Sequence, residues 1–233
     1  MDRKLALVFG GSRGIGAASV AALTRDGFDV AFTYVSEAPS GSSAAYRVNV
    51  EDAEAVAKFF VNVKRDFGQA PHVVVANAGI NVPPNPLASF PPEDFRRLVE
   101  VNLVGAFNVL AEAARQVQDG GSIIAVSTSL VRHAAPNFGP YVATKAGVES
   151  LVRALARELA GRNVRVNAIA PGPIDTDLFR SGKSSAAIQR SAEMSPFNRV
   201  GTPEEIAEVV AFLASEKASW IHGQIVQPNG GLV

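Results

Sequence analysis

The sequence has no cysteine and no excess of charge of either sign. The absence of cysteine excludes disulfide bonds and thiolate metal ligands. Lys and Arg together number 22, as do Asp and Glu, so the formal net charge is zero. Such a chain has no basic surface field to attract nucleic acid or an anionic membrane. We therefore expect no nucleic-acid partner, no membrane partner and no metal site, which leaves a small molecule as the favoured ligand.

Long hydrophobic runs are missing as well. The first apolar run reaches Gly10 after a few residues, which is too short for a signal peptide and far below a membrane span. This pattern predicts a cytoplasmic protein. Hydrophobic residues make up 47% and charged residues 19% of the 233 residues, enough apolar side chain for one large α/β core. We expect a single domain over residues 1–233.

Seven short apolar segments alternate with segments of helical periodicity. Several of them are apolar at consecutive positions, which is typical of parallel strands covered on both faces. The alternation predicts a Rossmann-type, doubly wound α/β fold with a mostly parallel seven-stranded sheet and helices on both faces. The expected strands are residues 4–9, 29–35, 46–50, 72–76, 122–127, 164–170 and 224–227, and the expected helices are residues 15–26, 52–66, 92–117, 141–161 and 203–215.

Two segments lack a helical pattern. Residues 36–45 contain Pro39, Gly41 and four serines, so we expect a loop where a crossover helix would be usual. Residues 171–200 are rich in Pro, Gly and Ser and have weak periodicity. They predict a mobile flap near the functional site.

A glycine-rich turn follows the first expected strand and opens a helix. Gly10, Gly14 and Gly16 would let the backbone approach a pyrophosphate, while the helix N-terminus supplies free N–H groups and partial positive charge. The spacing differs from the usual G-x-G-x-x-G dinucleotide pattern, so a purely structural turn is the alternative.

Tyr141 and Lys145 lie four residues apart in an expected helix and therefore on one helical face. An ammonium near a phenol stabilises the phenolate, and a tyrosine with an ordinary pKa of about 10 needs such help to exchange protons near neutral pH. The alternative is an ordinary exposed helix surface, because Y-x-x-x-K alone is common.

Two more motifs complete a series. Asn77-Ala78-Gly79 follows the fourth expected strand, and Pro171-Gly172-Pro173-Ile174-Asp175-Thr176 follows the sixth. In this order the motifs resemble the short-chain dehydrogenase/reductase family over essentially the whole chain, and its 3-oxoacyl-[acyl-carrier-protein] reductase-like branch in particular. The resemblance implies an NAD(P)-dependent oxidoreductase. Tyr141 would be the general acid that protonates a carbonyl oxygen, and Lys145 would bind the nicotinamide ribose and lower the pKa of Tyr141.

The resemblance implies further catalytic residues. Asn102 would hold a water of the proton relay, although an amide that bridges core backbone is the alternative. A substrate-orienting hydroxyl is expected after the fifth strand, where the chain has Ser127, Thr128 and Ser129. Thr128 stands thirteen residues before Tyr141, the commonest family spacing, and we favour it over Ser129.

The resemblance also implies which residues contact the cofactor. They lie in the glycine turn, at the ends of successive strands and around the catalytic pair. They are Gly10, Ser12, Arg13, Gly14, Ile15, Gly16, Tyr34, Ser36, Asn49, Val50, Asn77, Ala78, Gly79, Tyr141, Lys145, Pro171, Gly172, Ile174 and Thr176.

The choice between the two nicotinamide cofactors depends on the end of the second strand. Tyr34, Val35 and Ser36 replace the acidic residue that would bind a ribose 2′-hydroxyl, and Arg13 is placed to bind a 2′-phosphate. The pattern favours NADP(H). NAD(H) remains the alternative because Glu37 follows directly and Arg13 could be a solvated surface charge.

The leading functional hypothesis is an NADPH-dependent reductase of a ketone, aldehyde or 3-oxoacyl group. The alternatives are an NAD-dependent alcohol dehydrogenase and a non-catalytic nucleotide-binding sensor or scaffold. Substrate choice would reside in residues 82–90, 131–138 and 178–200, whose few charges indicate no strong demand for an anionic substrate. Family members usually assemble through their long helices, so we expect a homotetramer or homodimer.

Overall fold

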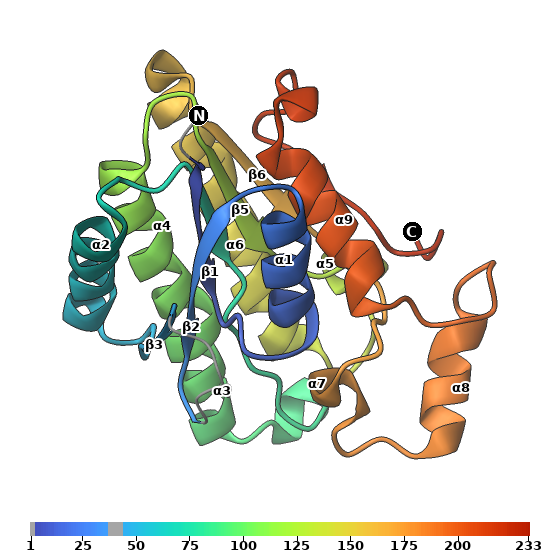
Figure 1. Cartoon of the computed structure of the whole chain (residues 1–233). Coiled ribbons are helices and arrows are strands. Elements are labelled where there is room, and N and C mark those ends of the chain that lie inside the picture. The colour runs from blue at the N-terminus through green and yellow to red at the C-terminus, as the bar shows by residue number, and fades with distance from the viewer. Residues whose placement is uncertain (1–2, 37–43) are drawn as a thin grey trace.

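The computed structural model describes residues 3–36 and 44–233 (Figure 1). In this part of the chain, seven strands form one sheet in the order β3-β2-β1-β4-β5-β6-β7, and every neighbouring pair is parallel. The doubly wound fold expected from the sequence is therefore confirmed. The strands are β1 (Leu5–Phe9), β2 (Asp29–Tyr34), β3 (Ala45–Arg47), β4 (Val73–Ala76), β5 (Ser122–Val126), β6 (Arg165–Ile169) and β7 (Ile225–Val226).

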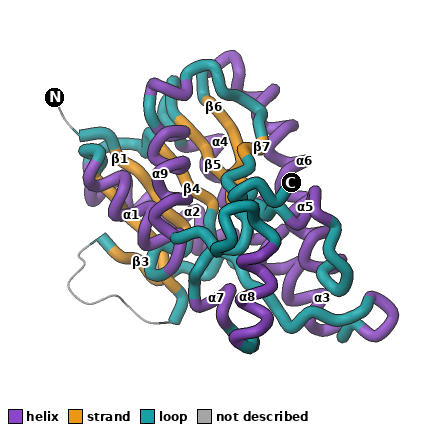
Figure 2. The backbone as a smooth tube through the Cα atoms, turned by 90° about the vertical axis from the view of Figure 1, so that its right-hand side faces the viewer, coloured by secondary structure: helices purple, strands orange, loops and turns teal. Residues whose placement is uncertain are grey.

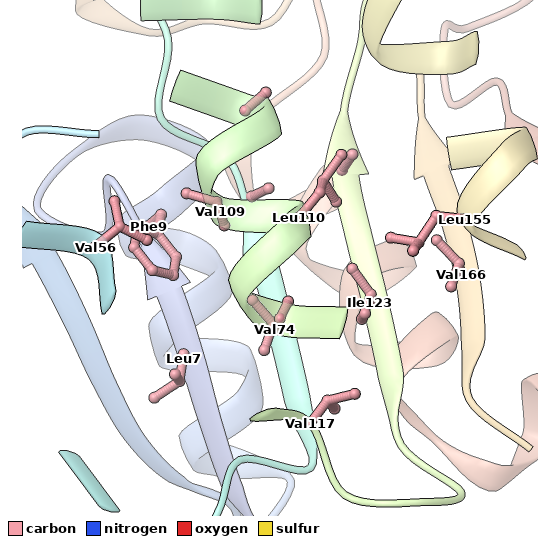
Figure 3. Packing of buried hydrophobic residues seen from close by; sticks show 14 of the residues in the cluster. Leu7, Phe9, Val56, Val74, Val109, Leu110, Val117, Ile123, Leu155 and Val166 are labelled. Atoms are coloured by element: carbon pink, nitrogen blue, oxygen red, sulfur yellow. The ribbon is translucent and has the colours of Figure 1, made fainter. Parts of the chain in front are cut away.

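Successive residues of a strand face opposite sides of the sheet, and both sides are buried. Leu5, Leu7 and Phe9 of β1 pack into one hydrophobic cluster, while Ala6 and Val8 pack into another. Figure 3 shows the first cluster, in which strand and helix side chains interdigitate. Two buried faces explain why the strand sequences are apolar at consecutive positions.

Helices cover the two faces in separate groups. The first cluster receives side chains from α2 (Ala53–Phe67), α4 (Gly105–Gln116) and α6 (Gly139–Leu159), and the second from α1 (Gly14–Arg25) and α9 (Pro203–Ala214). Figure 1 shows α1 and α9 side by side on one face. The shorter helical turns are η1 (Leu87–Ser89), α5 (Leu130–His133), η3 (Ala160–Arg162) and η4 (Glu216–Ala218).

The helix expected over residues 92–117 is not regular. It consists of α3 (Pro92–Leu98), a π-helical segment η2 (Val99–Val104) and α4. A π-helical turn widens the helix by one residue per turn and is frequent at functional sites. Here it contains Asn102. Hydrophobic periodicity could not reveal it, because the flanking α-helical turns dominate the pattern.

Residues 171–200 contain two helices that the sequence analysis missed, α7 (Asp177–Arg180) and α8 (Ser185–Glu193). Figure 2 shows them next to each other at one end of the molecule. Each begins at a hydroxyl cap: the oxygen of Thr176 accepts from the Phe179 amide, and that of Ser184 accepts from the Ala187 amide. Such caps satisfy free N–H groups and stabilise short helices that lack periodicity.

The loop expected at residues 36–45 lies mostly outside the described residues, since residues 37–43 are not described. Within residues 3–36 and 44–233, no helix is long and apolar enough to cross a membrane. The same residues contain no group of three or more His, Asp or Glu side chains that could hold a metal ion.

The glycine turn packs against the start of α1 without space for side chains. Gly10 has a positive φ of 73°, which only glycine adopts readily. A Cβ on Gly16 would lie 2.0 Å from the Gly10 carbonyl oxygen and 2.6 Å from the Asn77 amide nitrogen. The Gly10 carbonyl oxygen belongs to the backbone, so it cannot rotate away from an added Cβ as a flexible side chain could.

We predict that Gly16→Ala lowers the free energy of unfolding by about 3 kcal/mol or more, at the upper end of overpacking costs. Gly161→Ala is the matched control, because a Cβ there meets nothing within 4 Å. Chemical denaturation of both variants measures the difference. Equal stability of the two variants would contradict this account of the turn.

Candidate active site

The parallel register brings four loops to one edge of the sheet. β1, β4, β5 and β6 are consecutive neighbours, so the segments after their carboxyl ends lie side by side. Ligands in open α/β sheets bind at this edge. The loops are residues 10–13, 77–81, 127–129 and 170–176, and together they carry most of the residues that the sequence analysis singled out.

A cavity of about 430 Å³ lies above the glycine turn. The first turn of α1 has no side-chain cap at Arg13, so its N–H groups are free for a ligand. Small residues at the turn and a free helix N-terminus fit a dinucleotide pyrophosphate. The predicted cofactor residues that line this cavity are Gly10, Ser12, Arg13, Gly14, Ile15, Gly16, Tyr34, Ser36, Asn49, Val50, Asn77, Ala78, Gly79 and Thr176.

Two polar side chains hold the glycine turn in place. The hydroxyl of Thr33 accepts a hydrogen bond of 3.0 Å from the Gly10 amide, and the Asn77 amide donates to the carbonyls of Phe9 and Gly10 at 3.2 and 2.9 Å. Thr33 was missed by the sequence analysis, although a polar residue in the apolar strand DVAFTY was a signal. These bonds fix the turn against β2 and β4.

A second cavity of about 280 Å³ continues from the first. The two share Ile15, Asn77, Gly79, Ile80, Thr176 and Leu178, so they form one groove. The predicted residues in this second cavity are Ile15, Asn77, Gly79, Thr128, Ser129, Tyr141, Lys145, Pro171, Gly172, Ile174 and Thr176. Every predicted cofactor residue therefore lines one cavity or the other.

Tyr141 stands near the start of α6, across from the end of β5. Burial raises the pKa of the Tyr141 phenol to about 12, and a hydrogen bond with Thr128 opposes the rise. The Thr128 oxygen already accepts from the Leu130 amide at 3.3 Å, which leaves its proton free to donate. Thr128 is thus the hydroxyl that interacts with Tyr141, and its role in orienting a substrate stays a prediction.

The other two hydroxyls have different surroundings. Ser127 donates a 2.8 Å hydrogen bond to the buried carboxylate of Glu149, which also accepts from Arg153 at 3.0 Å. These bonds tie the end of β5 to α6 and so hold Thr128 and Tyr141 in register. Ser129 lines the cavity and is buried, and its amide donates to the Pro171 carbonyl.

The Lys145 ammonium is buried, with 5% of the residue exposed. It donates a 2.8 Å hydrogen bond to the Val126 carbonyl at the end of β5. Burial lowers the pKa of Lys145 from 10.5 to about 8. Burying an ammonium costs free energy unless an opposite charge or several hydrogen bonds compensate it. Lys145 has one hydrogen bond, so much of the cost of burying its charge is not compensated.

The effect of Lys145 on the pKa of Tyr141, which the resemblance implies, stays a prediction. The groups that set the pKa of Tyr141 are its buried surroundings and Thr128. Lys145 directs its hydrogen bond to the Val126 carbonyl instead of the phenol. Tyr141 and Lys145 line the same cavity, as their positions on one helical face predict.

Asn102 is fully buried and lines neither cavity. Its side-chain oxygen accepts from the Ile80 amide at 2.8 Å, and its nitrogen donates to the Ile80 carbonyl at 2.9 Å. It therefore bridges backbone, the alternative left open from the sequence. A Cβ on Gly79 would lie 3.1 Å from the Asn102 oxygen and 3.3 Å from the Lys145 ammonium, so both groups reach the same glycine.

Several cavity residues were not found from the sequence. Residues 82–90, expected to govern substrate choice, do not line the cavity, whereas the preceding Ile80 and Asn81 do. Arg97 of α3 lines the adenosine end, a position that no motif marked. The other two ranges expected to govern substrate choice, residues 131–138 and 178–200, do contribute to the second cavity. They supply Ala135, Phe138, Leu178, Phe179, Lys183, Ser191 and Met194. Val126, Leu130 and Leu232 also line this cavity and were not marked by the sequence.

Comparison with known proteins places the chain in a family. A family model described as enoyl-(acyl carrier protein) reductase matches residues 10–233. A solved structure of a Serratia marcescens short-chain dehydrogenase/reductase, in mutant form, is 32% identical and superposes with a TM-score of 0.89, covering 98% of this chain and 97% of that one. The chain belongs to the short-chain dehydrogenase/reductase family.

Curated relatives of this short-chain dehydrogenase/reductase carry reductase names. The 3-oxoacyl-[acyl-carrier-protein] reductase MabA of Mycobacterium tuberculosis is 40% identical over 230 residues, which cover 97% of this chain and 91% of that protein. A chloroplastic NADPH-dependent aldehyde reductase-like protein of Arabidopsis thaliana is 35% identical over 254 residues, covering 99% and 94%. The protein is an NAD(P)-dependent oxidoreductase.

We predict that Lys145→Met raises the free energy of unfolding near neutral pH by about 1–3 kcal/mol, because it removes a charge whose burial shifts the pKa from 10.5 to about 8. The folded protein binds fewer protons than the unfolded chain between these two values. Wild-type stability should therefore rise relative to the variant as pH increases through this window.

Urea unfolding from neutral pH to about pH 10 measures the difference. The control is Lys64→Met, which removes an exposed lysine of α2. A stability difference between wild type and Lys145→Met that stays constant over this range would contradict the buried-charge account.

Proposed function

We propose that this protein is an NADPH-dependent carbonyl reductase that converts a ketone, an aldehyde or a 3-oxoacyl group to the alcohol. One observation carries the proposal: Tyr141, Thr128 and Lys145 face a cavity that continues into the glycine-lined groove. A carbonyl compound in this cavity would lie beside a proton donor and next to the cofactor site.

Tyr141 is the general acid in this proposal. With a pKa of about 12, its phenol is protonated at neutral pH and can donate to a carbonyl oxygen. Thr128 donates to the same oxygen or to the phenolate that forms, because its proton is free. The bound nicotinamide would supply hydride to the carbonyl carbon. Lys145 places a positive charge in the same cavity and stabilises negative charge as it develops.

Asn102 has a positioning role. Its two hydrogen bonds fix the Ile80 backbone, and this holds Gly79 against the Lys145 ammonium. A water of the proton relay could use the second amide hydrogen of Asn102 or its main-chain carbonyl.

The groove supports NADP(H) as the cofactor. Arg13 is exposed at the rim of the adenosine end, where Tyr34 and Ser36 also lie, and a guanidinium there can bind a 2′-phosphate. A relative is named as NADPH-dependent. Glu51 and Asp177 line the same cavity, so NAD(H) is the second cofactor candidate.

The reverse reaction, oxidation of an alcohol with NAD, is the second candidate function. It requires Tyr141 to accept a proton, and a phenol with a pKa near 12 is rarely ionised at neutral pH. We favour reduction because the protonated phenol is the form that donates to a carbonyl oxygen. A sensor or scaffold would need no proton donor in the cavity, so the arrangement of Tyr141 and Thr128 favours an enzyme.

We also propose assembly as a homotetramer, or a homodimer, through the long helices α4 and α6. Phe107 of α4 is 53% exposed, and Phe95 of α3, which precedes it in the chain, is 43% exposed. These apolar side chains would be buried against a second copy that packs on α4. The cytoplasmic location and the absence of nucleic-acid and membrane partners stay predictions.

Tyr141→Phe should lower kcat for carbonyl reduction by about a hundredfold or more, the usual contribution of a general acid. Cofactor affinity should change little, because the aromatic ring remains. Fluorescence titration with NADPH separates binding from turnover. The matched control is Tyr46→Phe, which removes a hydroxyl bonded to Asp66 from a residue that lines neither cavity. Retained turnover in Tyr141→Phe would show that another group donates the proton.

We expect wild type to prefer NADPH over NADH by about 1–3 kcal/mol in kcat/KM, the range of a charge-assisted hydrogen bond. Arg13→Ala should remove most of this preference. Arg96→Ala is the control, since Arg96 is exposed on α3 and lines neither cavity. The role of Arg13 would be wrong if wild type preferred NADH or if Arg13→Ala left the cofactor ratio unchanged.

A further inference from the structure

The second cavity contains cations but no anions. Lys145 and Lys183 line it, and no Asp or Glu of the described residues does. Lys145 is committed to the end of β5 through the Val126 carbonyl. The Lys183 ammonium makes no hydrogen bond to another described residue. It follows α7 in the segment that carries the substrate side of the cavity.

The position of Lys183 is fixed by its surroundings. Its ammonium lies 3.5 Å from the centre of the Phe179 ring, a cation–π contact. Its amide donates to the Arg180 carbonyl at 3.0 Å, which closes the turn after α7. Arg180 in turn pairs with Asp175, and Thr176 caps the helix that carries Phe179. The ammonium is thus held by a short, well-anchored helix.

Lys183 is also electrostatically uncompensated. It is half-buried, and burial lowers its pKa with no charged neighbour contributing. No carboxylate of residues 3–36 or 44–233 forms an ion pair with it. A partly desolvated cation facing a cavity without an acidic partner is a binding position for an anion.

Most of the rest of the lining is apolar. Phe138, Leu178, Phe179, Met194 and Leu232 line the same cavity as Lys183 and the catalytic hydroxyls. Hydrocarbon bound here would bury its surface against them, and an anionic end would reach the lysine.

We propose that the substrate is an amphiphilic carbonyl compound whose anionic group binds Lys183 while its apolar part fills the cavity in front of Tyr141. This inference rests on the proposed carbonyl reductase function and names its substrate class. It goes beyond the sequence interpretation, in which the few charges of residues 82–90, 131–138 and 178–200 indicated no strong demand for an anionic substrate. The few charges there were counted from the sequence, but only the fold shows that one of them faces the cavity.

Matched substrates test the proposal. Semialdehydes of dicarboxylic acids with increasing chain length are compared with their methyl esters, which keep the aldehyde and remove the charge. Wild type should show kcat/KM about ten- to hundredfold higher for the acid at the best chain length, the value of one charge-assisted hydrogen bond. Equal kcat/KM for acid and ester at every length would overturn the proposal, while reduction of both would leave the carbonyl reductase function standing.

Variants assign the preference to one residue. Lys183→Met should lower kcat/KM for the acid about ten- to hundredfold more than for the ester, whereas Lys183→Arg should retain most of the preference for the acid. Lys64→Met is the control for removal of a surface lysine. If Lys183→Met lowered kcat/KM equally for acid and ester, the lysine would support only the fold of the flap, and the proposal would be wrong.

The anion could be a carboxylate of the carbonyl compound or a phosphate of a carrier. The 3-oxoacyl thioester of coenzyme A is therefore compared with that of N-acetylcysteamine, which lacks phosphate. Loss of a coenzyme A preference in Lys183→Met would identify a carrier phosphate as the source.

Binding gives a readout that does not depend on turnover. Calorimetry with NADP⁺ and medium-chain alkanoates should show binding to wild type, weaker binding to Lys183→Met, and weak binding of the matching alkanols to both. Equal affinity for alkanoate and alkanol would overturn the anion site even if no carbonyl compound tested were reduced.

Discussion

The backbone hydrogen bonds of one parallel sheet place the functional loops of this protein side by side. Because β1, β4, β5 and β6 all run in the same direction, their carboxyl ends open into a single groove. Side chains then refine the positions that the sheet sets. Asn77 and Thr33 hold the glycine turn, Asn102 holds the backbone of Ile80, and the Ser127–Glu149 hydrogen bond joins β5 to α6. The chemistry of the groove depends on this framework.

Two buried or half-buried lysines distinguish the catalytic end of the groove. Lys145 is hydrogen-bonded only to a main-chain carbonyl, and Lys183 rests on an aromatic ring. Neither lysine has a carboxylate partner among the described residues. The free energy cost of removing their ammonium groups from water can therefore be offset by negative charge on a bound ligand. A negatively charged transition state would offset it at Lys145, and an anionic substrate would do so at Lys183. Substrate binding and catalysis would then both depend on a lysine charge that has no carboxylate partner among the described residues.

Much of this arrangement could be predicted from the sequence, because strands buried on both faces and glycine-rich turns leave local signals. Every cofactor residue proposed from the motifs lines the groove. The sequence could not show the π-helical turn at Asn102 or the helices α7 and α8, since short elements held by caps have little periodicity. Spacing along the helix also could not show that the Lys145 ammonium donates a hydrogen bond to the Val126 carbonyl. The orientation of Lys183 depends on contacts between distant segments, which spacing alone does not encode.

The most direct test of the account is whether NADPH oxidation by the wild-type protein depends on a carbonyl compound. A panel of medium-chain aldehydes, semialdehydes and 3-oxoacyl thioesters is assayed by the absorbance of NADPH, with the corresponding alcohols and NADP⁺ in parallel. The account predicts rapid oxidation of NADPH with at least one carbonyl compound and slower reaction in the reverse direction at neutral pH. Tight NADPH binding without carbonyl-dependent oxidation anywhere in the panel would contradict it and indicate a nucleotide-binding sensor.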